Sequence, residues 1–170
     1  MRLSEFHGVG KIYIDSTIFI SHHSKDARDK ESCTNFLKKV EAGRIDACTS
    51  SVVVEETAYI LLKFKAAEIL GSDRHYEIIS TLRKDRNLFD DAWRVAEEHI
   101  QYVNALGFKG VLQIITQTAE PSFIGAIARK NRLLPRDATH VGIMKRNGIE
   151  NIATSDSDFE RVDFLKVWKP

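Results

Sequence analysis

The chain has 170 residues, of which 43% are hydrophobic and 29% are charged, an ordinary composition for one globular domain with a sizeable core. Its 25 basic and 24 acidic residues leave a net charge of +1, so any attraction to nucleic acid must come from a local patch. Two cysteines without a CxxC pair exclude a disulfide framework, and no apolar run approaches the ~20 residues of a membrane helix. We therefore expect a cytoplasmic protein without membrane contact, folded as a single domain over residues 1–170.

Short apolar strands and helices alternate in the first part of the chain. A β-rich strand at residues 11–15 precedes a short helix that Ser16 or Thr17 caps. The next predicted elements are a helix over residues 30–42, a strand over residues 45–49 and a strongly apolar helix over residues 52–64. This alternation is typical of a sheet whose strands are joined by helices.

The middle of the chain, residues 73–107, carries two apolar stripes at helical spacing and predicts a helical hairpin insertion that covers the sheet. Pro121 and Pro135 stand where helices are expected to begin. The remaining predicted elements are a strand over 111–116, helices over 121–131 and 135–146, and strands over 151–154 and 164–168. We therefore expect a three-layer α/β/α fold around a central parallel sheet of about five strands.

Four acidic residues, far apart in the chain, each stand where a strand ends or a helix begins: Asp15, Glu56, Asp137 and Asp156. In an α/β fold these positions lie at the carboxyl ends of the strands, where ligands bind. Two carboxylates ~4 Å apart repel by about 4 kcal/mol at an effective dielectric of ~20, so they converge around a cation. Oxygen ligands favour Mg²⁺ or Mn²⁺, and the pattern predicts metal-dependent phosphoester chemistry. Taken singly, each acid also has a structural interpretation as a helix cap, a dipole partner, a turn residue or a solvated helix residue.

The segments around these acids resemble the motifs of PIN-domain ribonucleases. Tyr13-Ile-Asp15-Ser-Thr17 is similar to the first motif, and Val53-Val-Glu-Glu56-Thr-Ala-Tyr59 is similar to the second. Arg136-Asp137-Ala-Thr-His140-Val and Thr154-Ser-Asp156-Ser-Asp158-Phe159 resemble the third and fourth. The ordered set spans residue 11 to the end of the chain, so the resemblance covers most of the sequence.

This resemblance implies a PIN fold, a Mg²⁺- or Mn²⁺-dependent endoribonuclease, and often the toxin of a VapC-type toxin–antitoxin pair. It also implies an RNA substrate, a cognate antitoxin and a homodimer. By motif, Asp15, Asp137 and Asp156 would hold the metal, while Glu56 would act through a water or as a base; Glu55 is the alternative acid at that motif. Supporting roles fall to Thr154, Asp158 and Ser16. The alternative is a PIN-like module that binds RNA or protein without cleaving it.

Basic residues and histidines suggest further contacts. A basic stretch, with Arg136 next to Asp137, is a candidate for following the phosphate backbone of RNA; helix-dipole pairing explains such residues equally well. The stretch comprises Arg129, Lys130, Arg132, Arg136, Lys145 and Arg146. His140 lies one helical turn after Asp137, either facing the site or packed in the core, and we expect His22 and His23 on the surface.

Overall fold

The computed structural model describes residues 1–24 and 27–170. Its centre is a parallel sheet of five strands in the order β3-β2-β1-β4-β5. The strands are β1 (Ile12–Ile14), β2 (Ala47–Ser50), β3 (Leu112–Ile115), β4 (Asn151–Ala153) and β5 (Lys166–Trp168). The predicted fold class, an α/β fold with a parallel sheet of about five strands, is confirmed.

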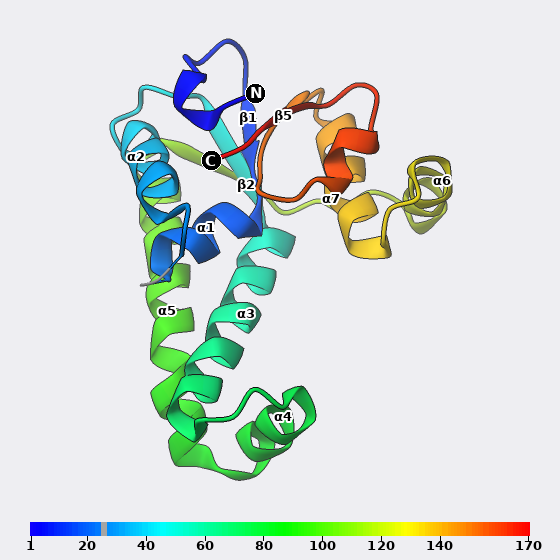
Figure 1. Ribbon diagram of the computed structural model, residues 1–170. Helices are drawn as coiled ribbons and strands as arrows, with labels where there is room; N and C mark the ends of the chain where they lie inside the picture. The colour runs from blue at the N-terminus through cyan, green and yellow to red at the C-terminus, as the bar shows by residue number, and fades with distance from the viewer. Residues whose placement is uncertain (25–26) are drawn as a thin grey trace.

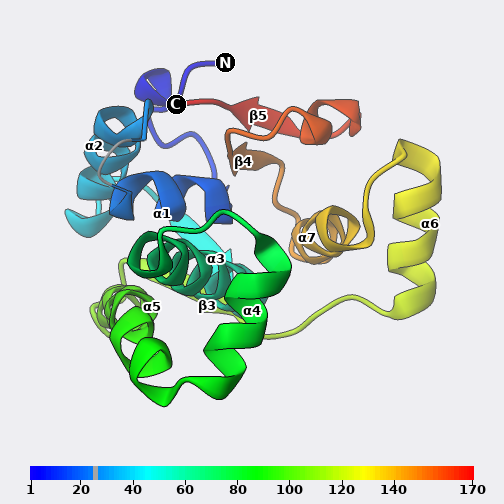
Figure 2. The ribbon, with the colours of Figure 1, turned by 60° about the horizontal axis from the view of Figure 1, so that its bottom comes forward.

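Helices lie on both sides of this sheet (Figure 1). The described helices are α1 (Ser16–His23), α2 (Lys30–Glu41), α3 (Ser51–Leu70), α4 (His75–Lys84), α5 (Arg86–Phe108), α6 (Pro121–Asn131) and α7 (Pro135–Arg146). The chain steps from β1 to β2 to β3 in one direction and then returns to β4 on the other side of β1. Because such crossovers are right-handed, this reversal places α1, α2 and α5 on one side of the sheet and α6 and α7 on the other, as Figures 1 and 2 show.

The reversal of strand order makes the junction of β1 and β4 the topological switch point of the sheet. The two strands pair in parallel with Ile14 opposite Ala153, so the residues that follow them, Asp15 and Thr154, emerge at the same edge. Every residue of both strands is buried, which explains why neither strand alternates between apolar and polar residues and why Asn151 is the one polar residue among the six. Ligands bind at this type of junction in open α/β sheets.

The helical middle of the chain is placed differently from the prediction. The long helices α3 and α5 extend beyond the sheet, and α4 packs near their far ends (Figure 1). Their apolar residues form a second core, including Ala58, Leu62, Ile78 and Ala96, that is separate from the main core under the sheet. The prediction that the hairpin covers the sheet is therefore wrong for α4 and the first part of α5. Only the last turns of α5, with Val103 and Leu106, join the main core.

Local signals account for most helix ends. Both α6 and α7 begin at the predicted prolines. Helix α3 runs six residues past its predicted end at Phe64, through good helix formers, and stops at Gly71, which adopts a left-handed conformation with φ of 61°. Among the described residues, no helix is long and apolar enough to cross a membrane.

Candidate metal and active site

Asp15 stands at the switch point, between the end of β1 and the start of α1. Its carboxylate caps α1 and is buried, with 4% of the residue exposed. One oxygen, Oδ2, accepts hydrogen bonds from the hydroxyls of Thr17 at 2.8 Å and Thr154 at 2.7 Å, and from the Thr17 amide at 3.4 Å. All these donors are neutral and hold Oδ2 in place, while no described residue donates a hydrogen bond to Oδ1.

Glu56 reaches the same place from the second turn of α3. Its Oε2 accepts a hydrogen bond from His140 Nε2 at 3.1 Å and lies 3.5 Å from Arg136 Nε. Burial alone would raise the pKa of Glu56, but the hydrogen bond and charge of His140, together with Arg136, lower it below its usual value. Glu56 is therefore held as a carboxylate, whereas Glu55 is exposed on the outside of the helix.

A buried chain of hydrogen bonds supports His140 from behind. Tyr13 OH lies 2.9 Å from His140 Nδ1 and 2.6 Å from Ser50 Oγ, and Ser50 in turn accepts from the Val53 amide at the start of α3. Burial raises the pKa of Tyr13 well above its ordinary value, so its hydroxyl stays protonated. Because a carboxylate only accepts, the hydrogen in the contact with Glu56 is carried by Nε2 of His140. The ring is thus fixed at both nitrogens.

Three side chains of the site come together. One ligand atom each from Asp15, Glu56 and His140 lies within 4.8 Å of the other two. Asp137, in the first turn of α7, is half-buried outside this trio. Burial raises its pKa, and so do the negative charges of Asp156, Asp15 and Glu56, while His140 lowers it. The charges of the other three predicted acids thus reach Asp137, and we call Asp15, Glu56, Asp137, Asp156 and His140 together the edge site.

The donor set of the edge site fits a hard divalent cation. Within residues 1–24 and 27–170, neither Asp15, Asp137 nor Asp156 forms an ion pair, while Glu56 pairs with His140 and Arg136. Carboxylate oxygens that gather without cationic partners repel one another and match the ligands that Mg²⁺ and Mn²⁺ take. Burial raises the pKa of Asp137 first, and the negative charges of the neighbouring carboxylates raise it further.

The supporting residues differ in what they do. Thr154 bonds Asp15 and also accepts from the Asp156 amide at 3.0 Å, so it ties the two segments together. Asp156 in turn accepts from the Asp158 amide at 2.8 Å, which shapes the turn after β4. The carboxylate of Asp158 forms an ion pair with Arg161 at 2.8 Å. Ser16 is buried at the first position of α1.

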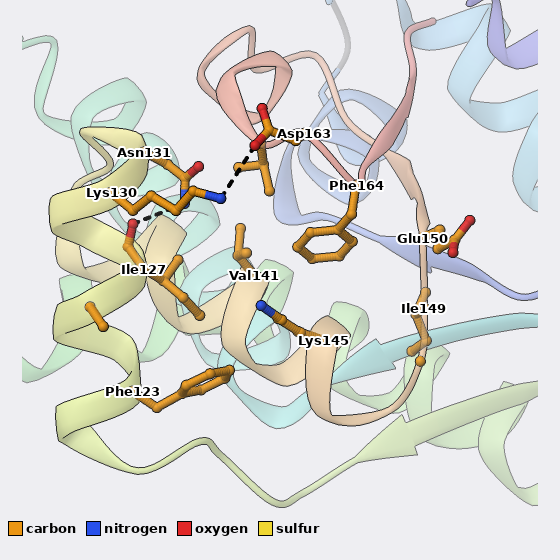
Figure 3. Close-up of a pocket in the computed structure, with 13 residues that line it drawn as sticks. Phe123, Ile127, Lys130, Asn131, Val141, Lys145, Ile149, Glu150, Asp163 and Phe164 are labelled. Carbon is orange, nitrogen blue, oxygen red and sulfur yellow. Dashed lines mark hydrogen bonds and ion pairs between the residues drawn. The ribbon is translucent and has the colours of Figure 1, made fainter.

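Several residues of the basic stretch have partners elsewhere. Lys130 pairs with Asp163 at 3.3 Å, and Arg146 with Glu120 at 2.7 Å. Lys145 lies over the rings of Phe123 and Phe164 in a hollow of about 480 Å³ between α6, α7 and the segment before β5 (Figure 3). Of the six basic residues, Arg136 contacts a carboxylate of the edge site, and it also donates to the Val52 carbonyl at 3.2 Å.

A second polar group, which we call the histidine cluster, consists of the buried His99 and the half-buried His22, His23 and Tyr102. The prediction that His22 and His23 lie on the surface is wrong, because the last turn of α1 packs on α5 and half-buries both. His99 Nδ1 lies 3.3 Å from His23 Nε2, and its buried Nε2 has no partner among the described residues. Burial lowers the pKa of His23 to about 4 and that of His99 to about 3, so the rings are neutral.

The sequence alone did not predict the polar contacts behind the site. These are the contacts of Tyr13 with Ser50 and His140, and the hydrogen bond that Thr17 donates to Asp15. Tyr13 sits inside a strand that is otherwise aliphatic, and a buried tyrosine hydroxyl usually finds a partner. That signal predicts a polar contact but not its identity, since His140 is 127 residues further along the chain. The sequence alone left open whether His140 faces the site or packs in the core. It does both, because its buried ring contacts Glu56 on one side and Tyr13 on the other.

The parallel sheet, the reversal at β1 and β4, and the acids gathered there define a class of α/β proteins with a carboxylate site at the switch point. The family model of the PIN domain matches residues 12–165, and the chain belongs to this family.

Relatives and solved structures agree over nearly the full length. The chain is 25% identical to Ribonuclease VapC6 of Methanocaldococcus jannaschii over 158 residues, covering 93% of this chain and 96% of that protein. The structure of VapC20 from Mycobacterium tuberculosis, described as a sarcin–ricin loop cleaving toxin, has a TM-score of 0.54 at 15% identity, with 91% of this chain and 96% of that chain covered. The structure of VapBC2 from Rickettsia felis, bound to a DNA fragment from its promoter, has a TM-score of 0.56 at 13% identity. The match covers 95% of this chain and 99% of that chain.

Proposed function

We propose that the protein is a Mg²⁺- or Mn²⁺-dependent endoribonuclease of the VapC type that hydrolyses phosphodiester bonds in RNA. The observation that carries this proposal is the edge site, where Asp15, Asp137 and Asp156 have no cationic partner within the described residues. The relative named as a ribonuclease supports the substrate class, because it aligns with this chain over almost all of its length. VapC20, whose fold this chain shares, is described as cleaving an RNA loop.

In this proposal Asp15, Asp137 and Asp156 would hold the cation, and the hydroxyl donors on Oδ2 of Asp15 leave its other oxygen without a donor among the described residues. The cation, when bound, supplies an activated water and neutralises charge that develops on the phosphate. Thr154 and Thr17 orient Asp15, and Thr154 also fixes the start of the Asp156 turn. Asp158 is a supporting residue that acts through this turn.

Glu56 is the proposed proton acceptor. Its lowered pKa keeps it ionised near neutral pH, and the contact with His140 restrains Oε2 so that the other oxygen is available to a water. His140 is a positioning residue in this scheme, because it touches Glu56 and is fixed by Tyr13 from behind. Arg136 also contacts Glu56, in an ion pair, and we propose that the Arg136 side chain contacts the RNA phosphates.

We further propose that the protein folds as one domain, forms a homodimer and is held by a cognate antitoxin. The solved VapBC2 assembly, to which this fold is similar, motivates the antitoxin. We place the reaction in the cytoplasm, which fits the two buried, unpaired thiols of Cys33 and Cys48.

The test is cleavage of a mixed pool of single-stranded and structured RNA by the purified protein with Mg²⁺, Mn²⁺ or EDTA. We expect cutting that requires the metal and disappears in Asp15→Asn and in Asp137→Asn. Asp73→Asn, an exposed residue between α3 and α4, is the matched control and should cut normally. Metal binding without cutting of any RNA in the pool would contradict the enzyme and favour a binding module.

A further inference from the structure

A hollow lies beside the edge site and shares Glu56 and Arg136 with it, while its other lining residues have no role in the chemistry described so far. It has a volume of about 420 Å³ and is lined by Glu55, Glu56, Tyr59, Ile60 and Arg136. This volume lies within the range of ~300–1,000 Å³ that small-molecule sites occupy. Glu56 belongs to both the hollow and the edge site, so whatever occupies the hollow lies next to the proposed point of cleavage.

The side of the hollow that α3 forms is aromatic and open. Tyr59 follows Glu56 by three residues and Glu55 by four, which places the three side chains on neighbouring positions of one helix surface. Tyr59 is 48% exposed, whereas the strand tyrosine, Tyr13, is fully buried. A large ring that stays half in water beside a polar site is available for stacking, and it contributes little to the core.

The other side of the hollow is formed by Arg136 from the first turn of α7. Its contacts with Glu56 and the Val52 carbonyl hold the guanidinium in place, although 47% of the side chain is exposed. Tyrosine rings and guanidinium planes are the two kinds of surface on which proteins stack unpaired RNA bases. The hollow therefore offers one aromatic and one cationic plane from two different helices.

We propose that this hollow is a nucleobase subsite that takes one unpaired base of the RNA next to the bond being cut. Tyr59 stacks on the base, Ile60 supplies the apolar floor and Arg136 bounds the opposite side. The inference rests on the proposed function for the nature of the substrate. A folded peptide segment fits less well, because the hollow combines a small volume with an ionised acid, a cation and a single exposed ring.

Glu55 gives the subsite a preference among bases. It is exposed at the hollow and, as a carboxylate, it can only accept hydrogen bonds. Adenine, cytosine and guanine carry an exocyclic amino group with two hydrogens that can donate to such an acceptor, whereas uracil has no amino group and offers only its ring N3–H between two carbonyls. The subsite therefore favours bases with an amino group over uracil.

The experiment measures binding of four fluorescent single-stranded homopolymer oligoribonucleotides by anisotropy, with the full chain carrying Asp15→Asn so that the RNA is not cut. We expect Tyr59→Ala to weaken binding about 5- to 150-fold, the equivalent of ~1–3 kcal/mol of stacking. Tyr59→Phe keeps the ring and should restore most of this loss. Tyr76→Ala, the same change at an 86% exposed tyrosine on α4, controls for the loss of an exposed ring elsewhere.

A second arm tests the base preference. The parent should bind the uridine oligomer most weakly, and Glu55→Gln should narrow the difference, because an amide also donates to the carbonyls of uracil. Unchanged affinity of Tyr59→Ala for all four oligomers, or no binding by the parent, would overturn the subsite. Failure of the proposed function gives a different result. If the protein without the Asp15 substitution never cuts RNA but still binds it in a way that depends on Tyr59, the nuclease proposal is wrong and the subsite stands.

Discussion

The edge site and the histidine cluster are both buried polar groups on the same scaffold, yet they handle charge in opposite ways. In the edge site, His140 and Arg136 lower the pKa of Glu56 and keep it ionised, while Asp15 is buried against neutral hydroxyls. In the histidine cluster, burial lowers the pKa values of His23 and His99 and leaves the rings neutral.

The difference lies in the donors that the fold supplies. Asp15 Oδ2 receives three hydrogen bonds, whereas His99 Nε2 has no partner among the described residues. A buried carboxylate that accepts several hydrogen bonds can keep its charge, whereas a buried histidine without partners loses its proton and becomes neutral. The edge site therefore gathers the negative charge that the proposed metal site requires, whereas the rings of the histidine cluster are neutral.

The largest expected effect is on catalysis. Asp15→Asn should reduce RNA cleavage by more than about 100-fold, because loss of a metal ligand exceeds the 10- to 100-fold effect of outer contacts. In the histidine cluster, His22→Gln should leave the rate within about threefold, because that side chain bonds only Thr34. Initial rates under saturating Mn²⁺ compare the two. Equal losses from both variants would remove the distinction between the regions.

Metal binding should change stability through the edge site only. Mn²⁺ at about 100 times its dissociation constant should stabilise the fold by about 2.7 kcal/mol, a rise of about 5–11 °C in the melting temperature. Asp137→Asn should melt above the parent in EDTA, because it removes a charge that its surroundings disfavour, and it should gain much less from Mn²⁺. Thermal melts in EDTA and Mn²⁺ give both values. A variant that melts below the parent in EDTA would argue against repulsion among the acids.

Two tyrosines allow a matched test of positioning. Tyr13→Phe removes the hydroxyl between Ser50 and His140 and should lower kcat about 10- to 100-fold with little change in KM. Tyr102→Phe removes a hydroxyl that bonds Glu41 at 2.6 Å in the histidine cluster and should leave kcat unchanged. Steady-state kinetics on one RNA substrate separates the two. Equal kcat values for both variants would show that the chain behind His140 serves stability alone.

The smallest effect is a dependence of stability on pH that belongs to the histidine cluster. His23 and His99 have folded pKa values of about 4 and about 3, below the ordinary value of 6.5. Their neutral rings therefore favour the fold above pH 6.5, and this contribution is lost as the pH falls from 6.5 toward 4 and 3. Within the cluster His22 also acts on His23 and His99, and Lys30, Lys38 and Glu41 are the charged groups that act on it from outside.

Replacing one of these histidines should make the stability of the fold depend less on pH below pH 6.5. His99→Leu removes one proton-binding group, so it should reduce the stability lost between pH 7.5 and pH 5 by at most about 2 kcal/mol. Urea unfolding at the two pH values measures the change. A loss as steep in this variant as in the parent would show that His99 does not titrate as the buried geometry requires.

How far the sequence predicts this molecule depends on how local the signals are. The bounds of α6 and α7 follow from Pro121, Pro135 and the residues that end each helix, because capping chemistry is local. The common edge of the four acids also follows, since strand ends in a parallel sheet share one side. The further extension of α3 to Gly71 was missed because an apolar pattern does not mark where a helix leaves the sheet.

The side-chain contacts could not be predicted. The bond between Glu56 and His140 joins residues 84 positions apart, and the contact of Asp15 with Thr154 joins residues 139 apart. Such contacts depend on how each helix is rotated about its axis and on the register of the strands. The pattern of apolar residues does not fix these closely enough to place two polar atoms within hydrogen-bond distance. The same limit hid the histidine cluster, since nothing local shows that α1 and α5 meet at His23 and His99.

The most direct test is anomalous diffraction from crystals soaked in Mn²⁺, compared with crystals of Asp15→Asn. We predict an ion within ligand distance of Asp15 and of at least one of Asp137 and Asp156, none at the histidine cluster, and loss of the ion in the variant. Saturating Mn²⁺ that leaves the edge site without an ion, or that binds only at His23 and His99, would contradict the account.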